Sequence, residues 1–249
     1  MRPGVKTGVF SAAASAVFLL FVWGLSGLPP VGYYRGPYGD EVNARTVSER
    51  HITDAVTAIN FDFRGLDTLG EEFIMFASVI GVALLLRTHP DGKKGRAATD
   101  HAKGRRVRGP SDAVRVFSVG LVGPMALFGI YIVTHGLLTP GGGFQGGLIL
   151  AGAFLMLYIA GAYDQLVKVA PYTLVEIAEA IGAGSYVLTG VLALFAGLPF
   201  LTNCLPIGKV HDIFSGGTVA LIDVAVGLEV AAGFILLLLA FMEEALKRT

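Results

Sequence analysis

The chain has 249 residues, with 19 basic and 19 acidic side chains and no formal net charge. Apolar residues make up 53% of it and 34 residues are glycine, and its mean hydropathy of +0.66 excludes an ordinary soluble domain. Several apolar runs reach the roughly 20 residues that cross a bilayer, and lipid favours helices because their backbone groups bond internally. The sequence therefore predicts an all-α, polytopic membrane protein.

Six spanning helices are predicted, in two modules. The first has Arg2 and Lys6 in front of it, as a signal peptide would, but no Ala-x-Ala site follows it, so we expect a retained helix. In chain order the predicted spans are Gly8–Leu28, Glu72–Arg87, Val114–His135, Gly146–Tyr163, Leu174–Gly197 and Ser215–Met242.

The basic residues predict the orientation of these helices. If both termini face the cytoplasm, most lysines and arginines fall on the cytoplasmic side, as the positive-inside rule requires. The basic stretch at 91–110 is then a cytoplasmic linker between a two-helix module at 1–90 and a four-helix module at 111–249. Positive-inside anchoring explains this stretch without a nucleic-acid partner.

A short helix is predicted in the outer segment before the second span. Its apolar positions follow the spacing i, i+3, i+4, i+7, and its other face is polar. It would lie either as a cap over the chain's own helices or on another protein of the same complex. The apolar residues are Ile52, Ala55, Val56 and Ile59, and the polar ones are Glu49, Asp54 and Thr57.

The start of the second span combines acids with one arginine. Thr68 and Glu71 have the spacing of a capping box, which predicts a helix start. We expect Arg64 to pair with Asp62 or Asp67 and to hold the turn. Glu71 and the glutamate after it then lie at the mouth of the membrane, where they could attract a cation.

Acids within the predicted helices are candidates for an ion pathway. A charged acid at the centre of a membrane helix costs about 2.5–3.5 kcal/mol on insertion scales. An interhelical hydrogen bond, an ion pair, or a proton or cation relay would each justify that cost. At 100° per residue, Asp223 and Glu229 point to different faces. The candidates are Asp223, Glu229, Glu71, Glu176, Glu179 and His135, which either caps its helix or changes protonation.

A glycine-rich junction, Thr139–Gly147, joins the third and fourth spans without any charge. Its glycine spacing matches a dinucleotide fingerprint, but no strand precedes it, so that interpretation is rejected. We expect Thr139 and Pro140 to start the fourth helix. Packing and a polar lining are the alternatives for the rest. The ridge of small residues is Gly143, Gly147 and Ala151, and Gln145 could line a wet cavity.

No enzyme chemistry is indicated. No Cys/His set has metal-ligand spacing, and no Ser/His/Asp arrangement is credible in these loops. We therefore expect no metal, no cofactor and no catalytic residue.

Two stretches resemble a known family. The junction Thr139–Gly147 and the motif Ile222–Val226 resemble the B-type component (MnhB) of the Mrp (Mnh) multisubunit sodium/proton antiporters. The stretch Asp62–Glu71 is similar to the carboxy-terminal segment of the A-type component, which also occurs as a separate small protein in membrane-bound hydrogenase complexes. The chain thus looks like a fusion of two neighbouring modules.

The resemblance implies a role in the cell membrane, within a complex related to the membrane arm of respiratory complex I. Its partners would be large A- and D-like subunits, small subunits, Na+ and H+. Pro140 and Phe144 fall within the MnhB signature, and Glu71 falls on a glutamate of the A-type segment. Two alternatives stay open: a redox-driven complex of the hydrogenase type, and a purely structural scaffold.

Overall fold

The structure is a computed structural model that describes residues 3–28, 32, 36–86 and 110–248. The predicted basic linker at 91–110 lies almost entirely outside these residues. The chain divides into two compact units, Met1–Asp40 and Glu41–Thr249. The first unit holds α1 (Pro3–Ser26), an apolar helix long enough to span a membrane.

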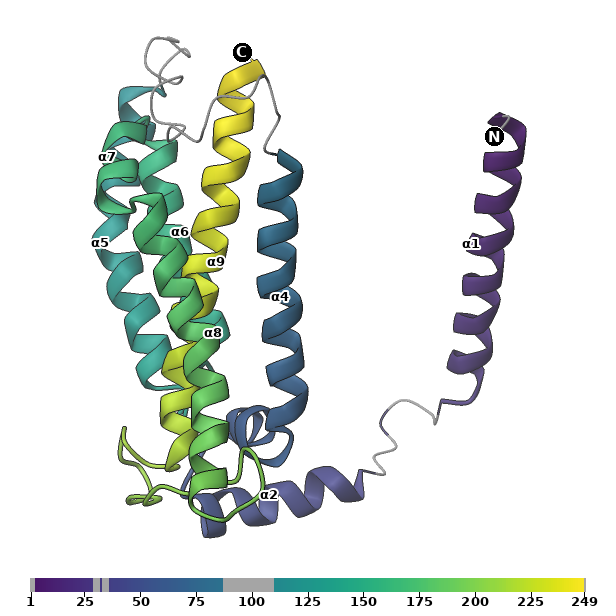
Figure 1. Ribbon diagram of the computed structural model, residues 1–249, viewed down its shortest axis with the longest axis vertical. Coiled ribbons are helices and arrows are strands. Elements are labelled where there is room, and N and C mark those ends of the chain that lie inside the picture. Colours follow the sequence, from purple (N-terminus) through teal and green to yellow (C-terminus); the bar gives the residue numbers. More distant parts are fainter. Residues whose placement is uncertain (1–2, 29–31, 33–35, 87–109, 249) are drawn as a thin grey trace. The chain divides into compact units, whose positions relative to one another are not determined.

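The second unit is a bundle of five long helices whose axes run side by side (Figure 1). Four are long and apolar enough to span a membrane, so with α1 there are five candidate spans among the described residues. The fifth bundle helix, α6, has 17 residues, which is close to the lower limit for crossing a bilayer. The prediction of an all-α polytopic membrane protein is confirmed. The bundle helices are α4 (Gly65–Leu86), α5 (Asp112–Thr134), α6 (Gly143–Ile159), α8 (Tyr172–Phe195) and α9 (Thr218–Arg248).

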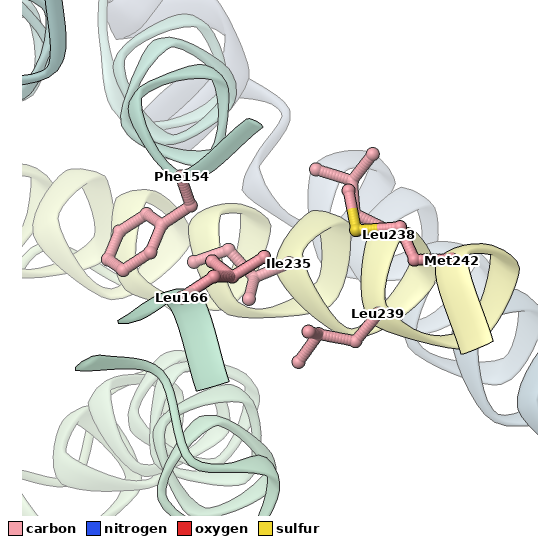
Figure 2. Close-up of a pocket in the computed structure, with 6 residues that line it drawn as sticks. All are labelled: Phe154, Leu166, Ile235, Leu238, Leu239 and Met242. Atoms are coloured by element: carbon pink, nitrogen blue, oxygen red, sulfur yellow. The ribbon is translucent and has the colours of Figure 1, made fainter. Parts of the chain in front are cut away.

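Helix α9 is the centre of this bundle. It packs most extensively against α6 and α8, and α4 covers a further side. Its buried side chains run through two apolar clusters, one near its start and one near its end. At the far end, Phe154 of α6 and Leu166 of α7 (Tyr163–Val169) lie over Ile235 of α9 in a wholly apolar pocket (Figure 2). Because no polar atom lines it, this pocket offers nothing to an ion.

The outer segment forms a cap over one end of the bundle, not the single amphipathic helix predicted. Helix α2 (Pro37–Arg50) ends at His51, whose positive φ of 55° turns the chain. Two short helices follow, α3 (Ala55–Ala58) and the π-helix η1 (Ile59–Phe63). Ile52 is fully buried in the core, whereas Val56, predicted on the same face, is exposed. The predicted polar face was also wrong, because Asp54 and Thr57 are buried in hydrogen bonds at the start of α3.

Two predicted helix starts were wrong for a related reason. Helix α4 begins at Gly65, so Thr68 lies inside it and no capping box forms. Helix α6 begins at Gly143, with Gly142 as its N-cap residue. Thr139 and Pro140 therefore belong to the preceding turn, since the acceptor that caps α6 comes from α9 and not from the local sequence.

Candidate functional site

Three buried glutamates come from three different helices of the bundle. Glu72 of α4 is 4% exposed, Glu179 of α8 is 3% exposed and Glu229 of α9 is 0% exposed. Their sequence neighbours Glu71 and Glu176 are exposed on the outside of the bundle. Each helix therefore turns one of its acids inward, and two of the predicted ion-pathway candidates do not lie inside this chain.

Glu229 occupies the middle of this arrangement. It lies about 16 Å along α9 from the first residue, at 1.5 Å per residue. Neither of its carboxyl oxygens has a hydrogen-bond partner. Both Glu72 and Glu179 are near enough to interact with it electrostatically. A fully buried acid without partners is an exception among side chains at such depth.

Glycines bring the three helices together around Glu229. A Cβ on Gly182 of α8 would lie 2.6 Å from the backbone nitrogen of Glu229, so only glycine lets α8 approach there. A Cβ on Gly233 would lie 3.2 Å from Oε1 of Glu179 and 3.3 Å from Val79 of α4. Glu179 thus reaches α9 one turn beyond Glu229. We call Glu72, Glu179 and Glu229 the three-glutamate cluster.

One oxygen in each of the other two glutamates is also unpartnered. These are Oε2 of Glu72 and Oε1 of Glu179. Tyr186 of α8 lies on the outer side of the cluster, where its hydroxyl donates a hydrogen bond to the carbonyl oxygen of Gly65 at 2.8 Å. Its ring packs edge-on against Phe61. The cluster is therefore closed off on that side by an aromatic residue tied to the start of α4.

Asp223 lies in a different environment, beneath the glycine-rich junction. Its Oδ1 accepts a hydrogen bond of 2.6 Å from the backbone N–H of Gly143, the first residue of α6. A carboxylate at a helix N-terminus is favoured by the helix dipole. A Cβ on Gly136 would overlap Oδ2 of Asp223, and one on Gly142 would lie 3.0 Å from Oδ1. The glycines at 136, 142 and 143 thus form a backbone cradle for this carboxylate.

The cradle also joins the outer cap to the bundle. The hydroxyl of Thr57 lies 2.7 Å from the carbonyl oxygen of Gly136 and 2.8 Å from Oδ2 of Asp54. Asp54 is near enough to interact electrostatically with Asp223. Gln145, predicted to line a wet cavity, is exposed, but its Oε1 lies 3.6 Å from the point that a Cβ on Gly142 would occupy. Several side-chain oxygens therefore converge on the junction.

The remaining signature residues divide between packing and surface. A Cβ on Gly147 would lie 2.7 Å from the carbonyl oxygen of Gly227 and 2.9 Å from Cβ of Val230, so α6 and α9 touch through their backbones there. Thr139, Pro140 and Phe144 are exposed.

His135 caps the end of α5, half-buried. Its ring stacks on Tyr131 with centroids 4.1 Å apart. It does not lie in the three-glutamate cluster.

The predicted ion pair at the start of α4 forms with one of its two alternatives. Arg64 pairs with Asp67, with Nε 2.7 Å from Oδ2. Asp62 pairs instead with Arg50, whose guanidinium also lies over the ring of Phe63. Burial raises the pKa of the Asp62 carboxyl above its ordinary value, and the nearby Arg50 opposes that shift. Arg50 therefore ties the end of α2 to η1.

The residue that the sequence analysis left out is Glu72. It shares a helical face with Leu69 three residues earlier and Val79 seven residues later, and all three are buried. That spacing is the signal that distinguishes it from Glu71. Among the described residues, no group of three or more His, Cys, Asp or Glu side chains could hold a metal ion.

Comparisons with known proteins agree with this architecture of membrane helices. A family model described as a domain related to the MnhB subunit of the Na+/H+ antiporter matches residues 113–236. An uncharacterized protein of Methanocaldococcus jannaschii is 30% identical over 228 residues, which cover 86% of this chain and 85% of that protein. A Rhizobium meliloti protein, named as an A/B component of a "Probable K(+)/H(+) antiporter", is 29% identical over 229 residues, 82% of this chain but 22% of that protein.

Two solved structures share the fold. A chain of the membrane-bound sulfane sulfur reductase, an archaeal respiratory membrane complex, is 29% identical, with a TM-score of 0.69 over 97% of this chain and 98% of that one. A chain of the Mrp complex from a Dietzia species matches 98% of this chain and 26% of its own length, with a TM-score of 0.68. At 23% identity the second likeness concerns the fold alone.

The helices and their buried acids define a multi-pass integral membrane protein. Within that class, the chain belongs to the MnhB-related family. The resemblance inferred from its glycine-rich junction is thereby confirmed.

Proposed function

We propose that this chain is a membrane subunit of an Mrp-type multisubunit cation/proton antiporter. The antiporter names of its family and of its rhizobial relative support the assignment. The single observation that carries it is Glu229, fully buried in the middle of a membrane helix without a hydrogen-bond partner. An acid in that position needs a reason beyond packing, and an ion or proton route supplies one.

Within this function, the buried acids take different roles. Glu229, Glu179 and Glu72 form the part of the route inside this chain. Asp223 holds the start of α6 and the junction in place, so it positions the route rather than forming it. Glu71 and Glu176 face outward, where they meet lipid or another protein of the complex.

The division into modules at 1–90, 91–110 and 111–249 belongs to the same proposal. The family model begins at residue 113, just after the proposed linker. The first module contributes α4, which packs against α9. The two modules would thus assemble as neighbouring subunits do, joined by the basic stretch.

A second candidate is a subunit of a redox-driven membrane complex. The observation that favours it is the match to the sulfane sulfur reductase chain over nearly the whole length of both chains. In the Mrp complex the similar region is about a quarter of a longer chain. A free-standing chain of this size therefore occurs in a respiratory complex.

One purification separates the two candidates. A gentle detergent pull-down of the tagged chain, with identification of the co-purified subunits, is followed by a sodium-dependent pH assay on the same sample after reconstitution. The antiporter function predicts antiporter-like large subunits and proton movement driven by a sodium gradient. Iron–sulfur or nickel subunits, with no sodium-driven proton movement, would favour the redox-driven complex instead.

A further inference from the structure

The three-glutamate cluster lacks the positive charge that three buried carboxylates would need. None of the salt bridges among the described residues involves its members. Desolvation and other acids, not lysine or arginine, act on their charges. Three ionised carboxylates in such a place would each lose hydration without compensation.

The groups that face Glu229 come from all the elements around it, and they are acidic or neutral. From α4 it meets Glu72, and from α8 it meets Glu179 and the Tyr186 hydroxyl. The exposed acids next in sequence, Glu71 and Glu176, add negative potential to Glu72 and Glu179. Every nearby charge therefore opposes ionisation of a second or third member.

Four oxygen atoms of the cluster are buried and unpartnered: both from Glu229, Oε2 of Glu72 and Oε1 of Glu179. They belong to side chains that are each less than a tenth exposed. Bound protons would turn some of these oxygens into donors for the others, which satisfies them without any further side chain. The described residues do not offer metal-holding geometry there, so the ligand that fits is the proton.

We propose that Glu72, Glu179 and Glu229 form one shared proton-binding site, which holds two protons and one negative charge at neutral pH. The three carboxyl groups titrate as a unit because each lies within reach of another's charge. Glycine at 182 and 233 keeps the helices close enough for this sharing. That the bound proton is transported rests on the proposed function; that it is bound does not.

Infrared difference spectroscopy of the purified complex tests the site. Protonated carboxyl groups absorb apart from carboxylates, so a change from neutral to alkaline buffer reports their deprotonation. In the wild-type complex we expect a protonated-carboxyl band at neutral pH. In each of Glu72→Gln, Glu179→Gln and Glu229→Gln, the part of the band that belongs to the cluster should fall by about one half, because two acids that share one charge keep one proton.

The exposed neighbours provide matched controls. Glu71→Gln and Glu176→Gln change the same chemical group one turn or less away, and we expect the wild-type band in both. The wild-type spectrum also stands without any variant, should a substitution impair assembly. A wild-type complex without the band, or a band unchanged in all three cluster variants, would overturn the proposal.

Sodium distinguishes a proton site from a cation site. Exchange of choline for sodium at constant pH should leave the cluster band unchanged. Loss of the band on sodium addition would show that a cation displaces the protons and would overturn the assignment. A cluster band in a complex that shows no antiport would leave the proton site standing and reject the proposed function.

Discussion

At the scale of single residues, two buried acids on one helix do different work. Asp223 and Glu229 are almost equally buried, but Asp223 accepts a hydrogen bond from the start of α6 and Glu229 accepts none. A charged acceptor at a helix N-terminus stabilises the fold, whereas an unpartnered buried acid costs free energy. We therefore assign stability to Asp223 and ion handling to Glu229.

Substitutions at Asp223 test this assignment. Asp223→Ala removes the acceptor of the Gly143 N–H and should destabilise the complex by about 1–3 kcal/mol. Asp223→Asn keeps an acceptor oxygen and should cost less than about 1 kcal/mol. Thermal unfolding of the detergent-solubilised complex measures both. Equal loss of stability in the two variants would contradict a capping role.

The sequence identified most of the buried acids but not their directions. Asp223, Glu179 and Glu229 stand out because they interrupt apolar runs. Choosing Glu72 over Glu71 required the true register of α4, whose start the local sequence misplaced. The Arg50–Asp62 pair was beyond prediction, because it joins two helices across a turn at His51.

At the scale of elements, the apolar runs predicted the long helices, whereas distant contacts determine two of their ends. The N-cap of α6 is completed by Asp223, 80 residues later in the chain. The backbone N–H of Thr218, the first residue of α9, donates to Asn203 at 2.9 Å. Local capping patterns cannot reveal partners of this kind. The short helices α3, η1 and α7 also escaped prediction.

The contact of α6 with α9 gives a prediction at this scale. Gly147→Leu would place a side chain against the backbone of Gly227, and overpacking of this kind costs about 1–3 kcal/mol or more. We expect less assembled complex and unchanged cation selectivity in what remains. Gly184→Leu is the control, because a Cβ on Gly184 of α8 meets nothing within 4 Å in this chain. Quantitative analysis of the purified complex, followed by transport assays with several cations, measures both effects. An assembled Gly147→Leu complex with altered selectivity would show that the ridge acts in the pathway.

At the scale of the whole molecule, the proposed fusion of two modules can be tested by cutting the chain. Residues 1–98 and 99–249, produced as separate chains in one cell, should still assemble with the other proteins of the complex, because α4 docks on α9 through side chains and not through the linker. Co-purification of both fragments and restored transport are the expected results. Recovery of one fragment alone would show that the linker is needed to hold the modules together.

The central claim is that Glu229 belongs to an ion or proton route, and sodium-driven proton movement in inverted vesicles tests it most directly. With equal amounts of assembled complex, Glu229→Gln should reduce this movement to background, whereas the conservative Glu229→Asp should retain part of it. If Glu229→Gln transports as well as the wild type, the route does not pass through Glu229. If it loses activity only in proportion to lost assembly, the acid serves as a scaffold and the account is contradicted.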